Sequence, residues 1–250
     1  MNKCAYCPST GPFTKEHIWP KALIQKYESL RTYNSKTNRF YTGEPVIKDV
    51  CAVCNNVKLS PLDGYLSQLY DTFFDKIIDA GKSVNFEFDY SLLLRALLKI
   101  SYNSTRASDN EKSKTVHAKF SNFIANGGYS RKVMLRLQIV TNSRAVNLTD
   151  QSEHIMAPEL MRCGIVPYDG PLAHRFCIRM VAINSFWFYL IIPYKEESEH
   201  KWRELLNGLT NWPTPTGVLI ERNSRKIHIP VDKTTYMHID LLGSLLQAQH

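Results

Sequence analysis

The sequence predicts an α+β protein, with a small N-terminal module at 1–80 followed by an α+β domain of unknown role at 81–250. Three observations support this prediction. Two Cys-x-x-Cys pairs lie within the first 54 residues. The stretch 89–105 is strongly apolar over a length typical of a buried helix. From Lys132 onward, short runs of apolar and β-branched residues are typical of strands. We therefore expect a helical segment after residue 80 and then a β-rich C-terminal part.

The strongest signal comes from four cysteines in two pairs, which are Cys4, Cys7, Cys51 and Cys54. Each pair offers two thiolates from one turn, and Zn²⁺ prefers four such ligands at tetrahedral angles. The N-terminal sequence MNKCAYC lacks the apolar region of a secretory signal, so we expect a cytoplasmic protein with reduced thiols. The quartet therefore predicts structural zinc rather than disulfides. Cys163 and Cys177 lie apart from it and are expected to be ordinary buried thiols.

The elements expected before residue 80 are short. The turn-rich segment CPSTGP at 7–12 predicts that Cys4 and Cys7 lie on a tight knuckle. Pro20 suits the first position of an amphipathic helix over 20–30. The polar segment 31–49 predicts a loop or hairpin, followed by a short strand that leads into the second knuckle. A second helix is expected from about Val57, because one apolar stripe recurs at helical spacing, at Leu59, Leu62, Leu66, Leu69 and Phe73.

After residue 80 the pattern predicts two helices and then a sheet. The helices are expected at 89–105 and 112–125, the second ending at the Gly127-Gly128 pair. Strands are expected at 133–140, 176–183, 186–192, 217–222 and 226–231. No apolar run reaches the ~18 residues that span a bilayer, so we expect no membrane partner.

A second set of polar residues lies close to the cysteines in the sequence. Glu16-His17 follows the first pair, and Asn55 follows the second pair directly. Taken alone, an acidic-His dipeptide is best interpreted as a pair of ordinary surface residues. A metal that joins the two pairs would bring the dipeptide towards Asn55. An imidazole can take a proton from water at neutral pH, and carboxylate and amide oxygens suit a hard divalent ion. These are the parts that phosphodiester hydrolysis needs.

The segments CAYC, TKEHIWPKAL and VCAVCNNVKLSPLD together resemble the HNH endonucleases, in their zinc-stapled branch. The resemblance covers about the first 65 residues, and its order and spacing are specific. It implies a ββα-metal module, in which a hairpin carries the acidic-His pair and a helix carries the asparagine. His17 would then be the general base that activates water. Glu16 and Asn55 would hold a catalytic Mg²⁺ or Mn²⁺, and the four cysteines would hold structural Zn²⁺.

The chain departs from the family pattern in two places. Many members have Asp or His where Glu16 stands, although the longer Glu could still reach an ion. The further His or Asn expected on the helix has no obvious counterpart. Lys58 could contact phosphate and Asp63 could support the site. A solvated helix face is an equally good interpretation of both residues. Asn56 could replace Asn55, but the resemblance favours the residue next to Cys54. The other histidines lack ligand spacing and are expected to be structural or exposed.

The net charge of +8 favours a polyanionic partner, although the excess is modest. In the segment 31–41, Arg31, Lys36 and Arg39 lie among aromatic residues, which suits a nucleic-acid strand as well as a solvated loop. We expect a DNA endonuclease whose C-terminal domain selects the substrate, binds a protein partner or forms a homo-oligomer. Two alternatives remain: a zinc-containing nucleic-acid-binding protein without catalysis, and a nuclease effector subunit of a defence complex.

Overall fold

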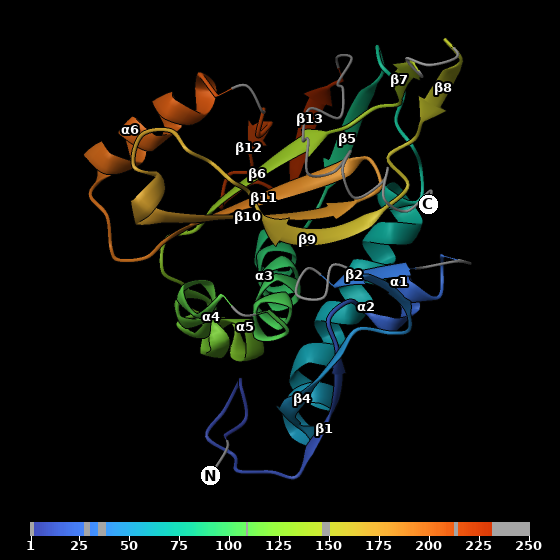
Figure 1. Cartoon of the computed structure of the whole chain (residues 1–250). Helices are drawn as coiled ribbons and strands as arrows, with labels where there is room; N and C mark the ends of the chain where they lie inside the picture. Colours follow the sequence, from blue (N-terminus) through green and yellow to red (C-terminus); the bar gives the residue numbers. More distant parts are fainter. Residues whose placement is uncertain are drawn as a thin grey trace.

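The computed structural model of the chain combines helices with antiparallel sheets, which confirms the predicted α+β class (Figure 1). It describes residues 3–27, 31–34, 39–108, 110–146, 151–212 and 215–231. Within these ranges, it describes the backbone but not the side chains of residues 31–34, 39–42, 143–146, 154 and 156. Arg31, Lys36 and Arg39, predicted to suit a nucleic-acid strand, have side chains outside this description. Within the described residues, no helix has both the length and the apolar character that crossing a bilayer requires.

The N-terminal elements surround the cysteine pairs. They are β1 (Phe13–His17), the single turn α1 (Lys21–Ile24), β2 (Arg31–Asn34), β3 (Arg39–Thr42) and β4 (Val46–Cys51). β1 pairs antiparallel with β4, and β2 pairs antiparallel with β3 as the expected hairpin. Consecutive helical segments follow, which are η1 (Cys54–Leu59), α2 (Ser60–Leu69) and η2 (Tyr70–Phe74). Two paired strands and a helix thus meet around the cysteines.

Two helices in this part differ from the prediction. The first was expected over 20–30 with Pro20 inside it, but α1 covers Lys21–Ile24 and Pro20 precedes it with ψ near 130°. The second was expected from about Val57 but begins at Cys54, because the cysteine knuckle runs directly into a π-helical turn. Four members of its predicted stripe, Leu59, Leu62, Leu66 and Leu69, are buried, and the fifth, Phe73, is partly buried.

The C-terminal part holds the larger elements. Its helices are α3 (Tyr90–Arg106), α4 (Glu111–Ala118), α5 (Ser121–Asn126), the 3₁₀ turn η3 (Ala173–Arg175) and α6 (Glu199–Thr210). Its strands are β5 (Ser83–Glu87), β6 (Met134–Ile139), β7 (Ser143–Val146), β8 (Glu153–Met156), β9 (Met161–Ile165), β10 (Phe176–Ile183), β11 (Phe186–Pro193), β12 (Val218–Leu219) and β13 (Lys226–Pro230). The main sheet has the order β12-β6-β11-β10-β9, and β5 pairs with β13.

One predicted helix is divided in two. The stretch 112–125 was expected to be continuous, but α4 ends at Ala118 and α5 begins at Ser121. The amide of Phe120 bonds the carbonyl of His117 there, and this tight turn brings the Phe120 ring into the core. The predicted end of the second helix is correct, since Gly127 follows α5 with φ of 73°, a conformation that favours glycine.

The main sheet is covered on both faces (Figure 1). Alternate side chains of β10 and β11 point to opposite faces. One set, including Phe186 and Phe188, joins the core that contains α3 and the N-terminal module. The other set, including Met180 and Tyr189, packs with Trp202 of α6 in a second core. This double burial explains why β10 and β11 read as almost continuous apolar runs.

The first core is continuous across residue 80. It joins Leu62 and Leu66 of α2 to Leu97 and Ile100 of α3, and it includes the cysteine region. The helix α3 therefore packs against both the N-terminal module and the sheet. The proposed division into 1–80 and 81–250 remains a prediction, and the two parts share buried side chains where they meet.

Candidate metal centre and adjoining polar cluster

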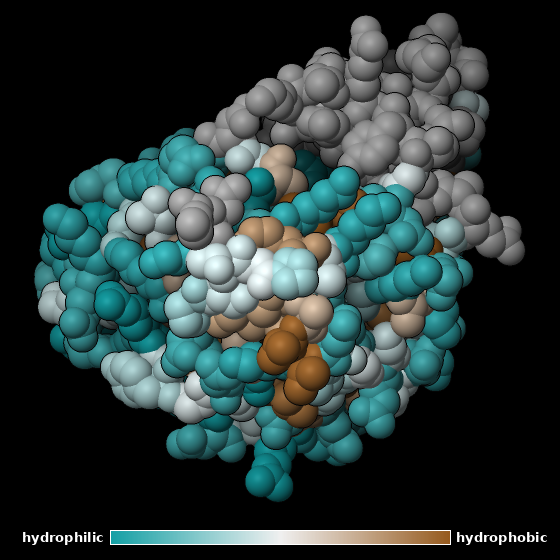
Figure 2. Space-filling view, turned by 90° about the horizontal axis from the view of Figure 1, so that it is seen from below, coloured by the Kyte–Doolittle hydropathy of each residue, from teal (hydrophilic) through white to brown (hydrophobic). Residues whose placement is uncertain are grey.

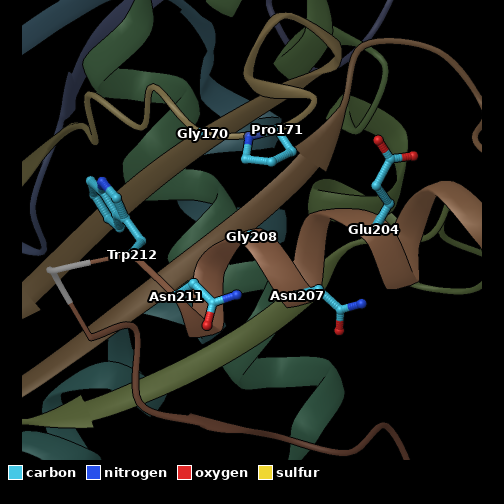
Figure 3. Close-up of a pocket in the computed structure, with 7 residues that line it drawn as sticks. All are labelled: Gly170, Pro171, Glu204, Asn207, Gly208, Asn211 and Trp212. Carbon is cyan, nitrogen blue, oxygen red and sulfur yellow. The ribbon is translucent and has the colours of Figure 1, made fainter.

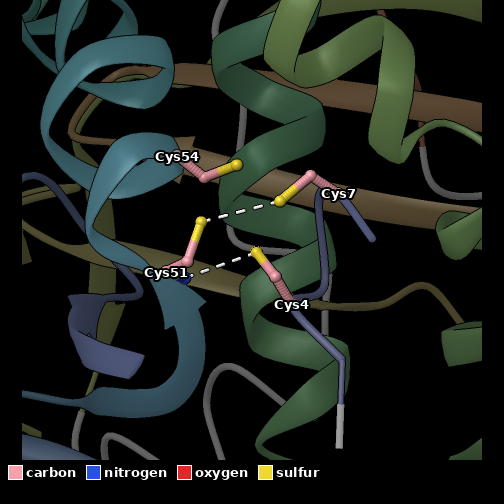
Figure 4. Close-up of side chains that lie close together, drawn as sticks. All are labelled: Cys4, Cys7, Cys51 and Cys54. Carbon is pink, nitrogen blue, oxygen red and sulfur yellow. Dashed lines mark hydrogen bonds between the residues drawn. The ribbon is translucent and has the colours of Figure 1, made fainter. Parts of the chain in front are cut away.

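The four cysteines of the predicted zinc site come together in the structure (Figure 4). Their sulfur atoms all lie within 4.8 Å of one another, and the Sγ atoms of Cys7 and Cys51 are 3.6 Å apart. Cys4, Cys51 and Cys54 are buried, and Cys7 is half-buried. This spacing lets the four sulfurs share one ion, as four thiolates around Zn²⁺ at about 2.3 Å would. The residues therefore fit a structural metal ion.

Backbone amides donate to this cluster, and the four thiols differ in pKa: it is lowered at Cys51, whereas burial and the neighbouring thiols raise it at Cys54. The amides of Tyr6 and Cys51 donate to Cys4 Sγ at 3.5 and 3.3 Å. Burial acts to raise the pKa of the Cys51 thiol, but the amide of Cys54 and the neighbouring thiols outweigh it and lower that pKa to about 7. Hydrogen bonds to the charged form favour that form, and the thiolate is the species that binds metal.

His17, the predicted general base, ends strand β1 and is partly exposed. Its side chain is 25% accessible, and its Nε2 lies 2.6 Å from Oε2 of Glu44, whose side chain is 42% accessible. Glu44 stands just before β4, and His17 pairs in register with Val46 of that strand. The imidazole therefore has an acidic partner that the sequence analysis did not identify. The hydrogen bond from His17 lowers the pKa of the Glu44 carboxyl.

Asn55, the predicted amide ligand, ties the second knuckle to β1. Its Nδ2 donates to Oγ1 of Thr14 and to the carbonyl oxygen of Lys15, both at 2.9 Å. Both hydrogen bonds use the amide nitrogen, so Oδ1 is the side-chain atom that could bind a cation. Thr14 in turn donates to the carbonyl of Val50 in β4. Asn55 thus joins the start of the helix to the strand that carries Glu16 and His17.

Glu16, the predicted carboxylate ligand, is buried on the inner side of β1. It is 2% exposed, its Oε1 lies 2.7 Å from the Lys99 ammonium, and the Asn103 amide donates to the same oxygen at 3.1 Å. Glu16 pairs in register with the buried Ile47, whereas His17 pairs with the exposed Val46. The two residues of the dipeptide therefore face different surroundings.

Asp63, considered as a support for the site, shares the same lysine. Its Oδ1 and Oδ2 lie 2.5 and 2.8 Å from Lys99 Nζ, and Lys99 is 1% exposed. One buried ammonium thus joins the carboxylates of Glu16 and Asp63. As they stand, Glu16 and Asn55 do not form an open oxygen site for Mg²⁺ or Mn²⁺, because the Glu16 carboxylate is occupied by Lys99. Their role as ligands of a catalytic ion remains a prediction.

Helix α3 supplies the inner partners of the module through a polar stripe. Lys99, Asn103 and Arg106 recur at spacings of four and three residues, so they lie on one face of the helix. Asn103 also donates to the carbonyl of His17 at 3.0 Å and accepts from the hydroxyl of Tyr6. Arg106 stacks over the rings of Tyr6 and Tyr102. The polar stripe was visible in the sequence of this apolar helix, but its position alone did not identify its partners.

The remaining positions named by the sequence have simpler surroundings. Lys58 is half-buried on η1 and Asn56 is exposed beside it. Cys177 is buried as predicted, whereas Cys163 is only half-buried and accepts a hydrogen bond from Arg179 at 3.3 Å. His117 is fully buried and bonded to Ser101 and to the carbonyl of Ser113, which agrees with a structural role. Burial first, and then the charge of Arg179, lower its pKa to about 4.

A shallow hollow lies elsewhere, beside α6 (Figure 3). Its lining residues are Gly170, Pro171, Glu204, Asn207, Gly208, Asn211 and Trp212. Glu204, its titratable member, already pairs with Lys201 at 2.7 Å.

The face seen in Figure 2 is mostly hydrophilic, with one small hydrophobic group at its centre. The cysteine cluster and the His17 neighbourhood therefore carry the stronger chemistry.

Comparisons of this chain with protein-family models, with curated proteins and with solved structures found no match. The resemblance to HNH endonucleases thus rests on the residues quoted above.

Proposed function

We propose that the protein is a zinc-stapled HNH-type endonuclease that hydrolyses phosphodiester bonds in DNA, with His17 as the general base. The observation that carries this proposal is the setting of His17. Its imidazole is partly exposed at the end of β1, while Asn55 ties that strand to the helix that starts at the cysteine cluster. A base that must reach a water molecule beside a phosphate needs such exposure together with a fixed backbone.

The proposal includes a divalent ion, Mg²⁺ or Mn²⁺, with Asn55 and Glu16 as its ligands. Such an ion supplies charge neutralisation at the scissile phosphate when it is bound. Asn55 supports this part because its Oδ1 remains for a cation. Oε1 of Glu16 already contacts the Lys99 ammonium, so an ion that binds this oxygen would have to displace Lys99. A Glu16→Gln variant that raises the metal concentration needed for half-maximal cleavage would support ligation, and an unchanged metal requirement would assign Glu16 to the fold alone.

Plasmid cleavage provides the main test. We expect the purified protein to cut supercoiled plasmid with Mg²⁺ or Mn²⁺, and chelation of these ions to stop the reaction. His17→Ala should lower the rate by ~10²–10⁴-fold, the usual effect of losing a general base. His200→Ala is the matched control, because His200 lies on α6 with a side chain that is 77% accessible. Zinc content and melting temperature should not change in either variant. Wild-type cleavage by His17→Ala would contradict the proposal.

A non-catalytic zinc protein that binds nucleic acid is the second candidate. The observation that favours it is the buried pairing of Glu16 and Asp63 with Lys99, since both carboxylates already have a cation. DNA affinity without cleavage under any divalent metal would support this candidate. A nuclease effector subunit of a defence complex would instead cut only after a partner binds the C-terminal part. The proposal also includes DNA as the partner and a cytoplasmic location. It further includes a protein partner or a homo-oligomer formed through residues 81–250.

A further inference from the structure

We infer that Glu44 is the positioning residue of His17, holding its imidazole so that Nδ1 is the nitrogen that receives the proton. This inference rests on the proposed nuclease function and goes beyond the resemblance, which assigned no role to Glu44. The carrying observation is the 2.6 Å separation between Glu44 Oε2 and His17 Nε2 at the partly exposed end of β1. It makes Glu44, rather than Glu16, the carboxylate that contacts the proposed base.

The chemistry of the pair determines which ring nitrogen carries the hydrogen. An ionised carboxylate can only accept hydrogen bonds, and the contact with His17 favours the ionised form of Glu44. His17 Nε2 must therefore be the donor. In a neutral imidazole the other nitrogen is then unprotonated and can act as a base. Lys21 of α1 is the other charged group that acts on Glu44, and it also favours the carboxylate.

The backbone on both sides of the contact is fixed. Ile18 donates its amide to the carbonyl of Pro45 at 2.9 Å, so the residues next to His17 and Glu44 are bonded to each other. On the inner side, Asn103 donates to the carbonyl of His17 at 3.0 Å. Gly43 precedes Glu44 with φ of 149°, a conformation that favours glycine and lets the chain turn into β4. The carboxylate therefore reaches the ring from a defined direction.

The buried Glu16 completes this arrangement. Its ion pair with Lys99 and its hydrogen bond from Asn103 hold β1 against helix α3. The strand is thus held from inside through Glu16, while the ring of His17 is held from outside through Glu44. The two carboxylates therefore act at different places: Glu16 contacts helix α3 on the inner side of β1, and Glu44 contacts the imidazole ring. An exposed ion pair adds little to stability, so the value of the Glu44 contact lies in orientation.

The test compares Glu44→Ala and Glu44→Gln with the wild type. A misplaced base typically costs up to ~10²-fold in rate. We expect Glu44→Ala to lower kcat by ~10–100-fold with KM unchanged, because Glu44 orients the base and does not hold DNA. Glu44→Gln should recover part of the loss, since its amide oxygen can still accept from Nε2. Glu87→Ala is the matched control: Glu87 is an exposed carboxylate on β5 paired with Lys226 at 3.0 Å.

Nitrogen NMR of labelled histidine gives a readout that does not depend on activity. With the His17 signal assigned by its absence in His17→Ala, the neutral ring of the wild type should show the hydrogen on Nε2. Glu44→Ala should show a mixture of both tautomers, at wild-type zinc content and Tm. An unchanged kcat in Glu44→Ala, or an unchanged tautomer, would overturn the inference. A wild type that cuts no DNA would instead remove the nuclease function, and the NMR result would then show separately whether Glu44 fixes the ring.

Discussion

At the scale of single residues, the buried charges determine how the N-terminal module is held against helix α3. Lys99 is almost completely buried and lies between the carboxylates of Glu16 and Asp63. Removing an ion from water is costly, and such a group is tolerated only when its partners are well placed. The side-chain amide of Asn103 donates a further hydrogen bond to the Glu16 carboxylate. The sequence identified Glu16 as chemically important but could not show that its partner comes from a helix more than 80 residues away.

Lys99→Met should destabilise the protein strongly. Methionine is close to lysine in size but leaves Glu16 buried without its cation, and removing one partner of a buried pair costs roughly 3–5 kcal/mol. Urea unfolding of the two proteins would measure this difference. Lys26→Met is the matched control, because Lys26 pairs with Asp71 at 2.7 Å on the surface, where both side chains are well exposed. Equal stability of the two variants would contradict a structural role for the Lys99 cluster.

At the scale of elements, helix α3 was predicted closely from the sequence. The expected range 89–105 agrees with Tyr90–Arg106 to within a residue at each end. Its start is clear because Asp89 accepts from the amide of Leu92 as an N-cap. The polar stripe of α3 could not be interpreted alone, since a polar helix face can be solvated or can bind another element. Its partners lie on β1, α2 and the first knuckle, which tertiary packing alone brings to it.

Two helical glycines should respond oppositely to alanine. Gly64 in α2 is exposed, and a methyl group there meets nothing within 4 Å. Gly64→Ala should therefore stabilise the protein by about 0.5–1 kcal/mol, because alanine restricts the unfolded chain and favours a helix. Gly208 in α6 lies against the Tyr168 hydroxyl, which would clash with a methyl group. Gly208→Ala should lower Tm. Stabilisation by both substitutions would show that Tyr168 moves away freely.

At the scale of the whole molecule, the sequence predicted the class of fold and the meeting of the four cysteines. Strands such as β10 and β11 were evident because their apolar runs are buried on both faces. The pairing of β1 with β4 and the role of Glu44 were not evident, since both depend on contacts between segments about 30 residues apart. The continuous core across residue 80 was missed for the same reason. Local patterns predict elements, whereas shared burial depends on how those elements pack.

This shared core leads to a prediction about zinc and cooperativity. Cys4, Cys7, Cys51 and Cys54 would bind one Zn²⁺ per chain, and metal binding that occurs only in the folded state contributes directly to folding. Helix α3 packs on the module and on the sheet together, so we expect the holoprotein to unfold in one transition. Zinc release, followed with a metal-sensitive dye, should coincide with the loss of sheet signal in circular dichroism.

Cys51→Ser tests the same coupling from the metal side. With one thiolate replaced, zinc content should fall below one per chain and Tm should drop for both signals together. Trp187 and Trp202 lie in the second core, on the sheet face opposite α3, whereas Trp19 lies in the first core with the cysteines. In a Trp19→Phe background, tryptophan fluorescence therefore reports unfolding far from the cysteines. If zinc left at a lower temperature while tryptophan fluorescence stayed native, the module at 1–80 would unfold independently and the division at residue 80 would be a true domain boundary. A single coincident transition would instead mean that helix α3 joins both parts into one cooperative unit.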